Sequence, residues 1–161
     1  VRAGVRLELT EPWRVVEAEA PACRGRRSLA RRSRPGRAGQ TRGGDACYGA
    51  ACLLDGRADT YWATDDGVTA ASVEITLPRP RTVDCVRVEE HIELGQRVEA
   101  FAVDALRGGR WTQIGAGSTI GPRRVLRTER VHAERFRLRI VASRACPAVR
   151  RLSLFEAGDG A

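Results

Sequence analysis

The strongest constraint on the fold is a repeated two-residue alternation of apolar and polar side chains. In residues 135–141 three apolar side chains alternate with three arginines. Because successive side chains of a strand point to opposite faces, this spacing predicts a strand with one buried and one solvated face. Similar alternation recurs at 71–77, 97–105 and 151–155, between Gly, Pro and Asp residues. No window has a clear helical period, so the sequence predicts an all-β antiparallel sandwich or barrel.

The formal net charge of +8 is concentrated at the N-terminus. Residues 1–43 contain 11 Arg and 4 acidic residues, a balance of +7, whereas residues 44–161 contain 17 Arg and 16 acidic residues, a balance of +1. The stretch 24–43 is rich in Arg, Gly and Pro and has little to bury, so we expect a linker or a poorly ordered segment. The alternative is an arm that binds nucleic acid or another anionic surface.

The composition changes near residue 40, since Trp13 is the one aromatic residue before it. We therefore expect an irregular Arg-rich N-terminal segment at 1–38, a β-sandwich at 39–157 and a tail at 158–161. No apolar run reaches the roughly 20 residues of a membrane helix. The chain starts at Val1 without a signal-peptide core, so we expect a piece of a longer precursor.

The sequence has few groups suited to catalysis. It contains two histidines and lacks a nucleophile elbow, a zinc-protease motif and a phosphate-binding loop. The paired carboxylates Asp65–Asp66 and Glu89–Glu90 do not suit glycoside hydrolysis, because neighbours on a strand face opposite ways. We expect no catalytic residues in this chain.

Five cysteines leave at least one thiol without a disulfide partner within the chain. A Cys47–Cys52 or a Cys52–Cys146 disulfide is possible, and the spacing does not choose between them. Cys85 alternates with apolar neighbours and is expected to be a small core residue.

A short segment rich in oxygen acceptors follows Cys52, where residues 55–60 read Asp-Gly-Arg-Ala-Asp-Thr. Asp55 and Thr60 can offer side-chain oxygens and the turning backbone can offer carbonyls, a set that suits Ca²⁺. The other interpretation is a turn whose Asp accepts backbone N–H bonds. The residues alone leave both interpretations open.

This segment also resembles a known family. The string A-x-x-L-D-G-x-x-D-T-Y-W, a seven-strand pattern and a terminal L-x-L-F strand are similar to the discoidin domain, which is the coagulation factor 5/8 type C domain and overlaps carbohydrate-binding module family 32. The resemblance covers residues 36–156. It implies a jelly-roll β-sandwich with a galactose-binding-like topology.

A closer resemblance is to the C-terminal discoidin-like domain of α-L-fucosidases in glycoside hydrolase family 29. It rests on four strings: RGGDACYG at 42–49, YWATDDGV at 61–68, EHIELGQRV at 90–98 and TIGPRR at 119–124. Residues 1–35 do not resemble the catalytic barrel of those enzymes. The resemblance implies a non-catalytic part of a secreted or extracellular fucosidase-like enzyme.

Many discoidin-like domains hold a structural calcium in this loop. The resemblance implies the ligands Cys52, Asp55, Arg57 and Thr60. Where the family has a Glu before the last strand, this chain has Arg150–Arg151. A guanidinium there would repel a cation or replace its charge by pairing with Asp55. We therefore expect that no cofactor is required.

Sugar sites in this fold lie on loops at one end of the sandwich, where polar groups meet hydroxyls beside an aromatic platform. The carbohydrate-binding candidates are Asp65, Asp66, His91, Glu93, Gln96, Arg97 and Arg144. Tyr48 is the best exposed ring, and Trp62 is expected in the core.

Each candidate has a structural alternative. Glu93 and Arg97 could pair across a turn, and Asp65–Asp66 could belong to an ordinary turn. Gln96 and Arg97 could instead bridge to a neighbouring catalytic domain.

We expect a module that binds a fucose- or galactose-containing glycan or braces a fucosidase catalytic domain. One alternative is a free-standing lectin-like adhesion module that binds glycans or anionic surfaces. Another is nucleic-acid binding through the Arg-rich arm, which we disfavour. Membrane insertion is not expected, since the loops carry Asp65-Asp66-Gly67 and Arg107-Gly108-Gly109 instead of apolar spikes.

Overall fold

A computed structural model describes residues 26–156, so the expectations for residues 1–25 and 157–161 lie outside the described residues. The strands are β1 (Arg34–Ala38), β2 (Trp62–Ala63), β3 (Ala71–Glu90), β4 (Val98–Arg107), β5 (Arg110–Gly117), β6 (Arg124–Ser143) and β7 (Ala148–Glu156). The short 3₁₀ turns are η2 (Leu29–Arg32), η3 (Arg42–Gly44), η4 (Ala46–Tyr48), η5 (Ala50–Leu53) and η6 (Ile92–Leu94). Among the helical segments described within residues 26–156, none could span a bilayer.

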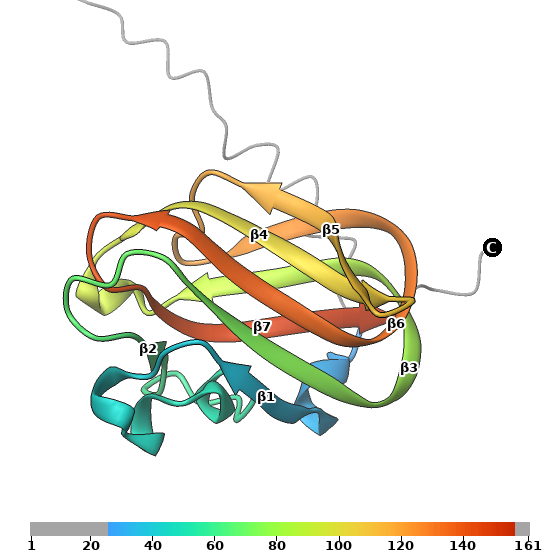
Figure 1. Cartoon of the computed structure of the whole chain (residues 1–161), viewed down its shortest axis with the longest axis horizontal. Coiled ribbons are helices and arrows are strands. Elements are labelled where there is room, and N and C mark those ends of the chain that lie inside the picture. Colours follow the sequence, from blue (N-terminus) through green and yellow to red (C-terminus); the bar gives the residue numbers. More distant parts are fainter. Residues whose placement is uncertain (1–25, 157–161) are drawn as a thin grey trace, which may run out of the picture.

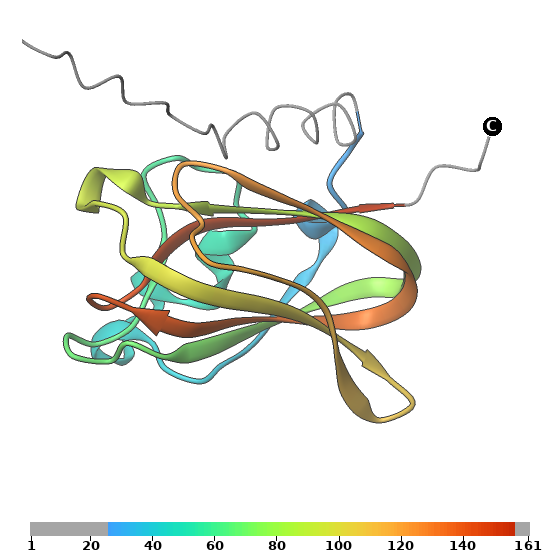
Figure 2. The ribbon, with the colours of Figure 1, turned by 90° about the horizontal axis from the view of Figure 1, so that it is seen from above.

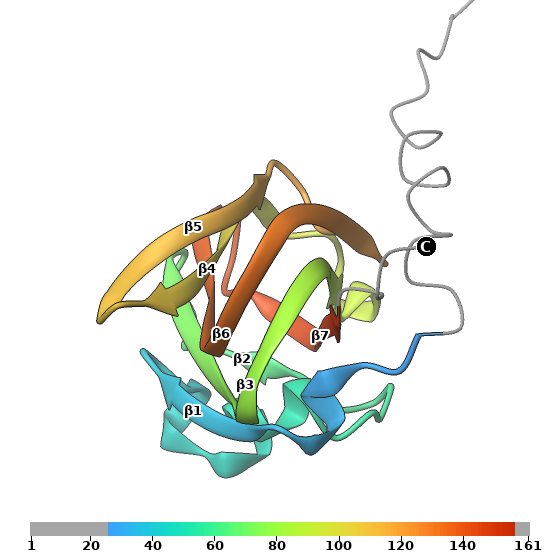
Figure 3. The ribbon, with the colours of Figure 1, turned by 90° about the vertical axis from the view of Figure 1, so that its right-hand side faces the viewer.

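The two longest strands, β3 and β6, hold the sandwich together. Each has 20 residues and pairs with the other antiparallel along most of its length. Their ladder is interrupted between Thr76 and Arg81, where β3 contains Pro78 and Pro80. Proline has no N–H for the ladder, so the strands can bend there. Figure 3 shows both strands arching from one layer to the other.

The arch divides the strands into two layers. β1, β4 and β5 join the first half of β3 and the second half of β6. The other layer has the order β2, β7, the second half of β3 and the first half of β6, in which each strand pairs with the next. Figures 1 and 2 show these layers facing each other. The predicted all-β sandwich is confirmed.

The core lies between the layers. Trp62, Phe101 and Phe136 are almost fully buried there, and the prediction for Trp62 is confirmed. In residues 135–140 of β6 the apolar side chains are buried and the arginines are more exposed, as the alternation predicts. A hydrogen bond from the Trp62 indole N–H to the carbonyl of Gln40 (3.0 Å) ties the core to the loops at one end.

The outward arginines of β6 are more than a solvated face. Arg137 and Arg139 each approach the buried carboxylate of Asp104 on β4 to 2.7 Å. Burial opposes ionisation of Asp104, but the hydrogen bonds from Arg139 and Arg137 outweigh it and lower its pKa. The ring of Trp111 on β5 lies 4.5 Å from the Arg137 guanidinium.

Residues 26–38 differ from the predicted linker. β1 pairs antiparallel with β3, with Arg34 opposite Thr76. Arg26 forms an ion pair with Asp84 (2.6 Å). This arginine-rich segment is thus held by main-chain pairing, by charge and by Leu29, which packs against the core.

Candidate functional site at the loop end

Several connections meet at one end of the sandwich, at the left of Figure 1. They are η3 and η4, the segment around β2, the loop after β3 and the β6–β7 connection. The side chains that they bring together form what we call the loop-end cluster. Its members are Arg42, Tyr48, Tyr61, Asp66, His91, Arg97 and Cys146.

A buried carboxylate fixes the loop after β3. Glu90 is 1% exposed and accepts three backbone N–H bonds, from Arg97 (2.9 Å), Val98 (2.9 Å) and Gly121 (2.7 Å). The Glu90 N–H also donates to the Gly121 carbonyl (3.0 Å). Gly121 has a φ of 63°, a conformation that favours glycine. Glu90 therefore clamps residues 91–97 against the turn at 119–123.

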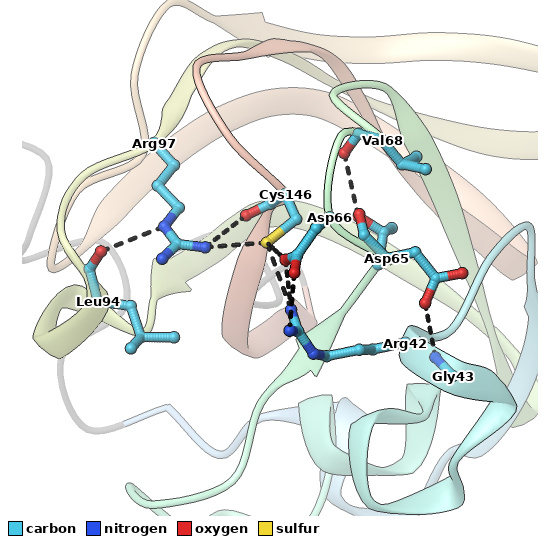
Figure 4. Close-up of polar contacts among 9 residues, drawn as sticks. Arg42, Gly43, Asp65, Asp66, Val68, Leu94, Arg97 and Cys146 are labelled. Carbon is cyan, nitrogen blue, oxygen red and sulfur yellow. Dashed lines mark hydrogen bonds and ion pairs between the residues drawn. The ribbon is translucent and has the colours of Figure 1, made fainter.

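A polar network joins all four of these parts of the chain, as Figure 4 shows. Arg42 makes two hydrogen bonds to the Asp66 carboxylate, at 2.8 and 3.1 Å. Arg97 donates to the carbonyl (2.9 Å) and Sγ (3.0 Å) of Cys146, whose thiol lies 3.5 Å from Asp66 Oδ1. The hydrogen bonds from Arg42 and Cys146 lower the pKa of Asp66. Two guanidiniums and one carboxylate are thus held in place around a buried thiol.

Three rings lie beside this network. Tyr61 stacks on His91, with centroids 4.3 Å apart and planes inclined by 17°. Tyr48 lies 5.5 Å from Tyr61 at 54°. Burial is the main cause that raises the pKa of Tyr61. The rings form a continuous, partly exposed aromatic surface next to charged hydrogen-bonding groups.

The structure brings three of the predicted sugar-binding residues, Asp66, His91 and Arg97, into the cluster. Asp65 lies at its edge, where its carboxylate accepts the Gly43 N–H (2.6 Å). Arg144 is outside it, paired with Glu99 (2.8 Å).

The Glu93–Arg97 pair, which the sequence left open as a structural alternative, does not form. Glu93 lies 3.3 Å from His91 Nδ1, and Arg97 Nε donates to the Leu94 carbonyl (3.1 Å). The reason is that η6 turns the chain so that the nearest acceptor for Arg97 is a backbone oxygen. Gln96 is exposed beside the Gly121 turn.

Sequence reasoning missed Arg42, Tyr61, Cys146 and Glu90 as parts of the site. Arg42, Tyr61 and Glu90 stand inside the strings that carry the fucosidase resemblance, and that was the available signal. Cys146 had no such signal. Its place between two arginines depends on how the β6–β7 connection folds.

The two disulfides left open by the sequence do not form. Cys47, Cys52 and Cys146 are free, whereas Cys85 is disulfide-bonded. Cys52 instead donates its thiol hydrogen to the Cys47 carbonyl (3.1 Å), and burial raises its pKa. Cys85 is buried as predicted, but it is not a simple core thiol.

In the loop that could hold calcium, polar groups of the loop form hydrogen bonds with one another. The Asp55 carboxylate accepts hydrogen bonds from the Arg57 N–H (2.8 Å) and the Thr60 hydroxyl (2.7 Å). The guanidinium of Arg151 donates to the Gly56 carbonyl (3.0 Å), a different partner from the Asp55 expected for it. A positive charge on a loop carbonyl is unfavourable for a cation, so these residues do not fit calcium. In the part of the chain described, no cluster of three or more His, Cys, Asp or Glu could hold a metal.

The known proteins that this chain resembles in sequence and fold include fucosidases and a chitosan-binding module. Alpha-L-fucosidase 1 of Arabidopsis thaliana is 24% identical over 111 residues, which are 67% of this chain and 22% of that protein. A GH29 fucosidase of Ruminococcus gnavus, solved in complex with fucose, is 27% identical with a TM-score of 0.75 over 83% of this chain and 27% of that one. The chain thus spans about a quarter or less of the length of these relatives.

A smaller protein shares the fold alone. Chitosan-binding module 1 from a Paenibacillus chitosanase/glucanase is 16% identical with a TM-score of 0.70, over 81% of this chain and 98% of the module. The family model of the F5/8 type C domain matches residues 37–151. This chain is therefore a member of the F5/8 type C domain family, related to α-L-fucosidases.

Proposed function

We propose that this chain is a non-catalytic module of a fucosidase-like glycoside hydrolase, and that the loop-end cluster binds a glycan. The observation that carries the proposal is the ring surface of Tyr48, Tyr61 and His91 beside Arg42 and Asp66. Sugars present apolar C–H faces that pack on rings, and hydroxyls that need charged or polar partners. The proposed setting is extracellular, in line with the fucosidase relatives.

The network would act by being preorganised. Arg42 and Arg97 are held by Asp66 and by Cys146, so little side-chain entropy remains to be lost on binding. The outer lone pairs of the Asp66 carboxylate, which is largely exposed, remain available to sugar hydroxyls. Fucose- or galactose-containing glycans are the proposed class, by analogy with the fucosidase relatives.

A glycan array followed by calorimetry tests this proposal. Tyr48→Ala and Asp66→Asn should each weaken binding about tenfold or more, the scale of an important contact residue. Trp111→Ala is the matched control, because it removes a partly exposed ring from the β4–β5 hairpin, away from the cluster. An equal loss of affinity in the control, or silence on every fucose- and galactose-containing glycan, would contradict glycan binding.

One observation favours a second role, which is bracing of a catalytic domain. Leu94 is 42% exposed at η6, and its carbonyl anchors Arg97 in the cluster. An exposed leucine beside a rigid polar network resembles the centre of a domain contact. If bracing dominates, Leu94→Glu should weaken association with the catalytic domain of the precursor, whereas glycan affinity should stay unchanged. Association is measured by ultracentrifugation of the mixed domains.

A further inference from the structure

The second layer of the sandwich carries a groove on its outer face, separate from the loop-end cluster. Its volume is about 1320 Å³. None of its described lining residues belongs to the cluster. The arginines that line it come from four parts of the chain: Arg26, Arg27, Arg32, Arg79, Arg81, Arg87, Arg123 and Arg151.

The charge of this groove is unbalanced. Among the described lining residues, none is Asp or Glu. Arg26 is neutralised by Asp84 and Arg81 by Glu156. Arg27, Arg32 and Arg79 are exposed and form no ion pair with the described residues.

Beneath the groove lies one buried carboxylate that several arginines share. Glu89 is 1% exposed and lies 3.2 Å from Arg87 and 3.7 Å from Arg123. It also lies 3.1 Å from Arg150 and 3.8 Å from Arg151. One negative charge among four guanidiniums leaves an excess of positive charge facing the groove. Burial is the main cause that lowers the pKa of Arg87, and the neighbouring arginines add to it.

The shape of the groove selects among anionic ligands. It is larger than the roughly 300–1,000 Å³ of an ordinary small-molecule site, so one anion would not fill it. Its only described ring, Phe155, is 2% exposed beneath the Arg87 guanidinium, so no stacking platform for nucleic-acid bases is present among the described residues. An extended chain can enter such a concave site, and guanidiniums pair in a fork with sulfate or carboxylate groups.

We propose that this groove binds an acidic polysaccharide, which is a sugar chain with sulfate or carboxylate groups. The guanidiniums of Arg32, Arg79 and Arg123 would contact the acidic groups. This site does not depend on the proposed function of the loop-end cluster, because the two share no lining residue.

The test measures binding of dextran sulfate, carboxymethyl-dextran and neutral dextran by calorimetry with the full chain. We expect binding of one or both charged polymers, weakening as salt rises, and no binding of neutral dextran. Arg32→Glu/Arg79→Glu should weaken binding of the charged polymer at least about tenfold. Whether sulfate or carboxylate binds more tightly identifies the acidic group.

The control variant is Arg107→Glu/Arg110→Glu, which makes the same change of charge on the exposed β4–β5 turn. It should change the affinity less than twofold if the groove is the site. Equal losses in both variants would overturn the proposal, since net charge alone would then explain binding. Tighter binding of an oligonucleotide than of dextran sulfate at the same salt would also overturn it.

Circular dichroism checks that each variant is folded. If the double variant Arg32→Glu/Arg79→Glu is unfolded, the single variant Arg27→Glu replaces it. A Tyr48→Ala variant should bind the charged polymer normally, which separates this site from the loop-end cluster.

Discussion

Glu89 and Glu90 are adjacent and equally buried, yet they belong to two different regions of the molecule. Glu90 points to the loop end and is satisfied by three backbone N–H groups. Glu89 points to the outer face and is surrounded by four guanidiniums. Backbone donors cannot move away from a carboxylate, whereas arginine side chains can also reach solvent or a ligand. The comparison indicates that Glu90 fixes the conformation of the loop after β3. Glu89 instead gathers four arginines and neutralises only part of their positive charge.

The largest effect should come from Glu90→Ala. Three buried N–H groups would lose their acceptor, and each unsatisfied buried donor is costly. We expect a loss of roughly 3–5 kcal/mol in the free energy of unfolding. Denaturant titration followed by tryptophan fluorescence measures it. A loss below about 1 kcal/mol would mean that water replaces the carboxylate and that Glu90 is not the clamp.

Glu89→Gln should have a smaller effect on stability, about 1–3 kcal/mol, because the released guanidiniums are partly exposed and can hydrate. Added sulfate should restore stability to this variant more than to the wild type or to Glu90→Ala, since anions can replace the missing charge. Melting curves in sulfate and in chloride at equal ionic strength measure this. An equal effect of sulfate on all three proteins would contradict the proposed difference between Glu89 and Glu90.

Asp104 extends the comparison to a carboxylate held by two arginines, Arg137 and Arg139. Its pKa is lowered in the folded state, so its contribution is present above the unfolded value of about 3.9 and is lost as the pH falls below it. Asp104→Asn should cost about 1–2 kcal/mol at pH 7. The difference from wild type should shrink as the pH falls below about 4. A difference that stays constant with pH would point to packing instead of charge.

The smallest effect should come from metal removal. The Asp55 oxygens already accept hydrogen bonds from Arg57 and Thr60, and Arg151 contacts the Gly56 carbonyl. EGTA should therefore leave the melting temperature unchanged, and Ca²⁺ should not raise it. Calorimetric scans with and without EGTA measure this, with magnesium as the control for ionic strength. A drop of several degrees that Ca²⁺ reverses would mean that the loop opens to accept the ion.

Much of the fold could be predicted, because it depends on local alternation. The strand at 135–141, the turn at Gly108–Gly109 and the burial of Trp62 follow from residue type and spacing. The pairing of residues 34–38 with β3 could not be predicted, since their apolar content is low and the main chain supplies the bonds. Arg137 and Arg139 were assigned to a solvated face because their partner Asp104 lies on another strand.

The site was predicted only in part. Asp66, His91 and Arg97 were predicted, and the structure places them in the cluster. Their partners Arg42, Tyr61 and Cys146 were not predicted as parts of the site. The alternative pairing of Glu93 with Arg97 does not form, because η6 brings the Leu94 carbonyl to Arg97 while Glu93 lies near His91.

The sequence alone determined that this protein is a β-sandwich of the F5/8 type C family and that neighbouring residues such as Glu89 and Glu90 face opposite sides. The period of two sets the direction of a side chain whatever the partner strand is. Only the tertiary structure decided what each carboxylate meets. Those partners include Gly121 and Arg150, which lie 31 and 61 residues away, and strand register and loop closure bring them close. Strand register and loop closure also place two arginines around Asp104 and four around Glu89.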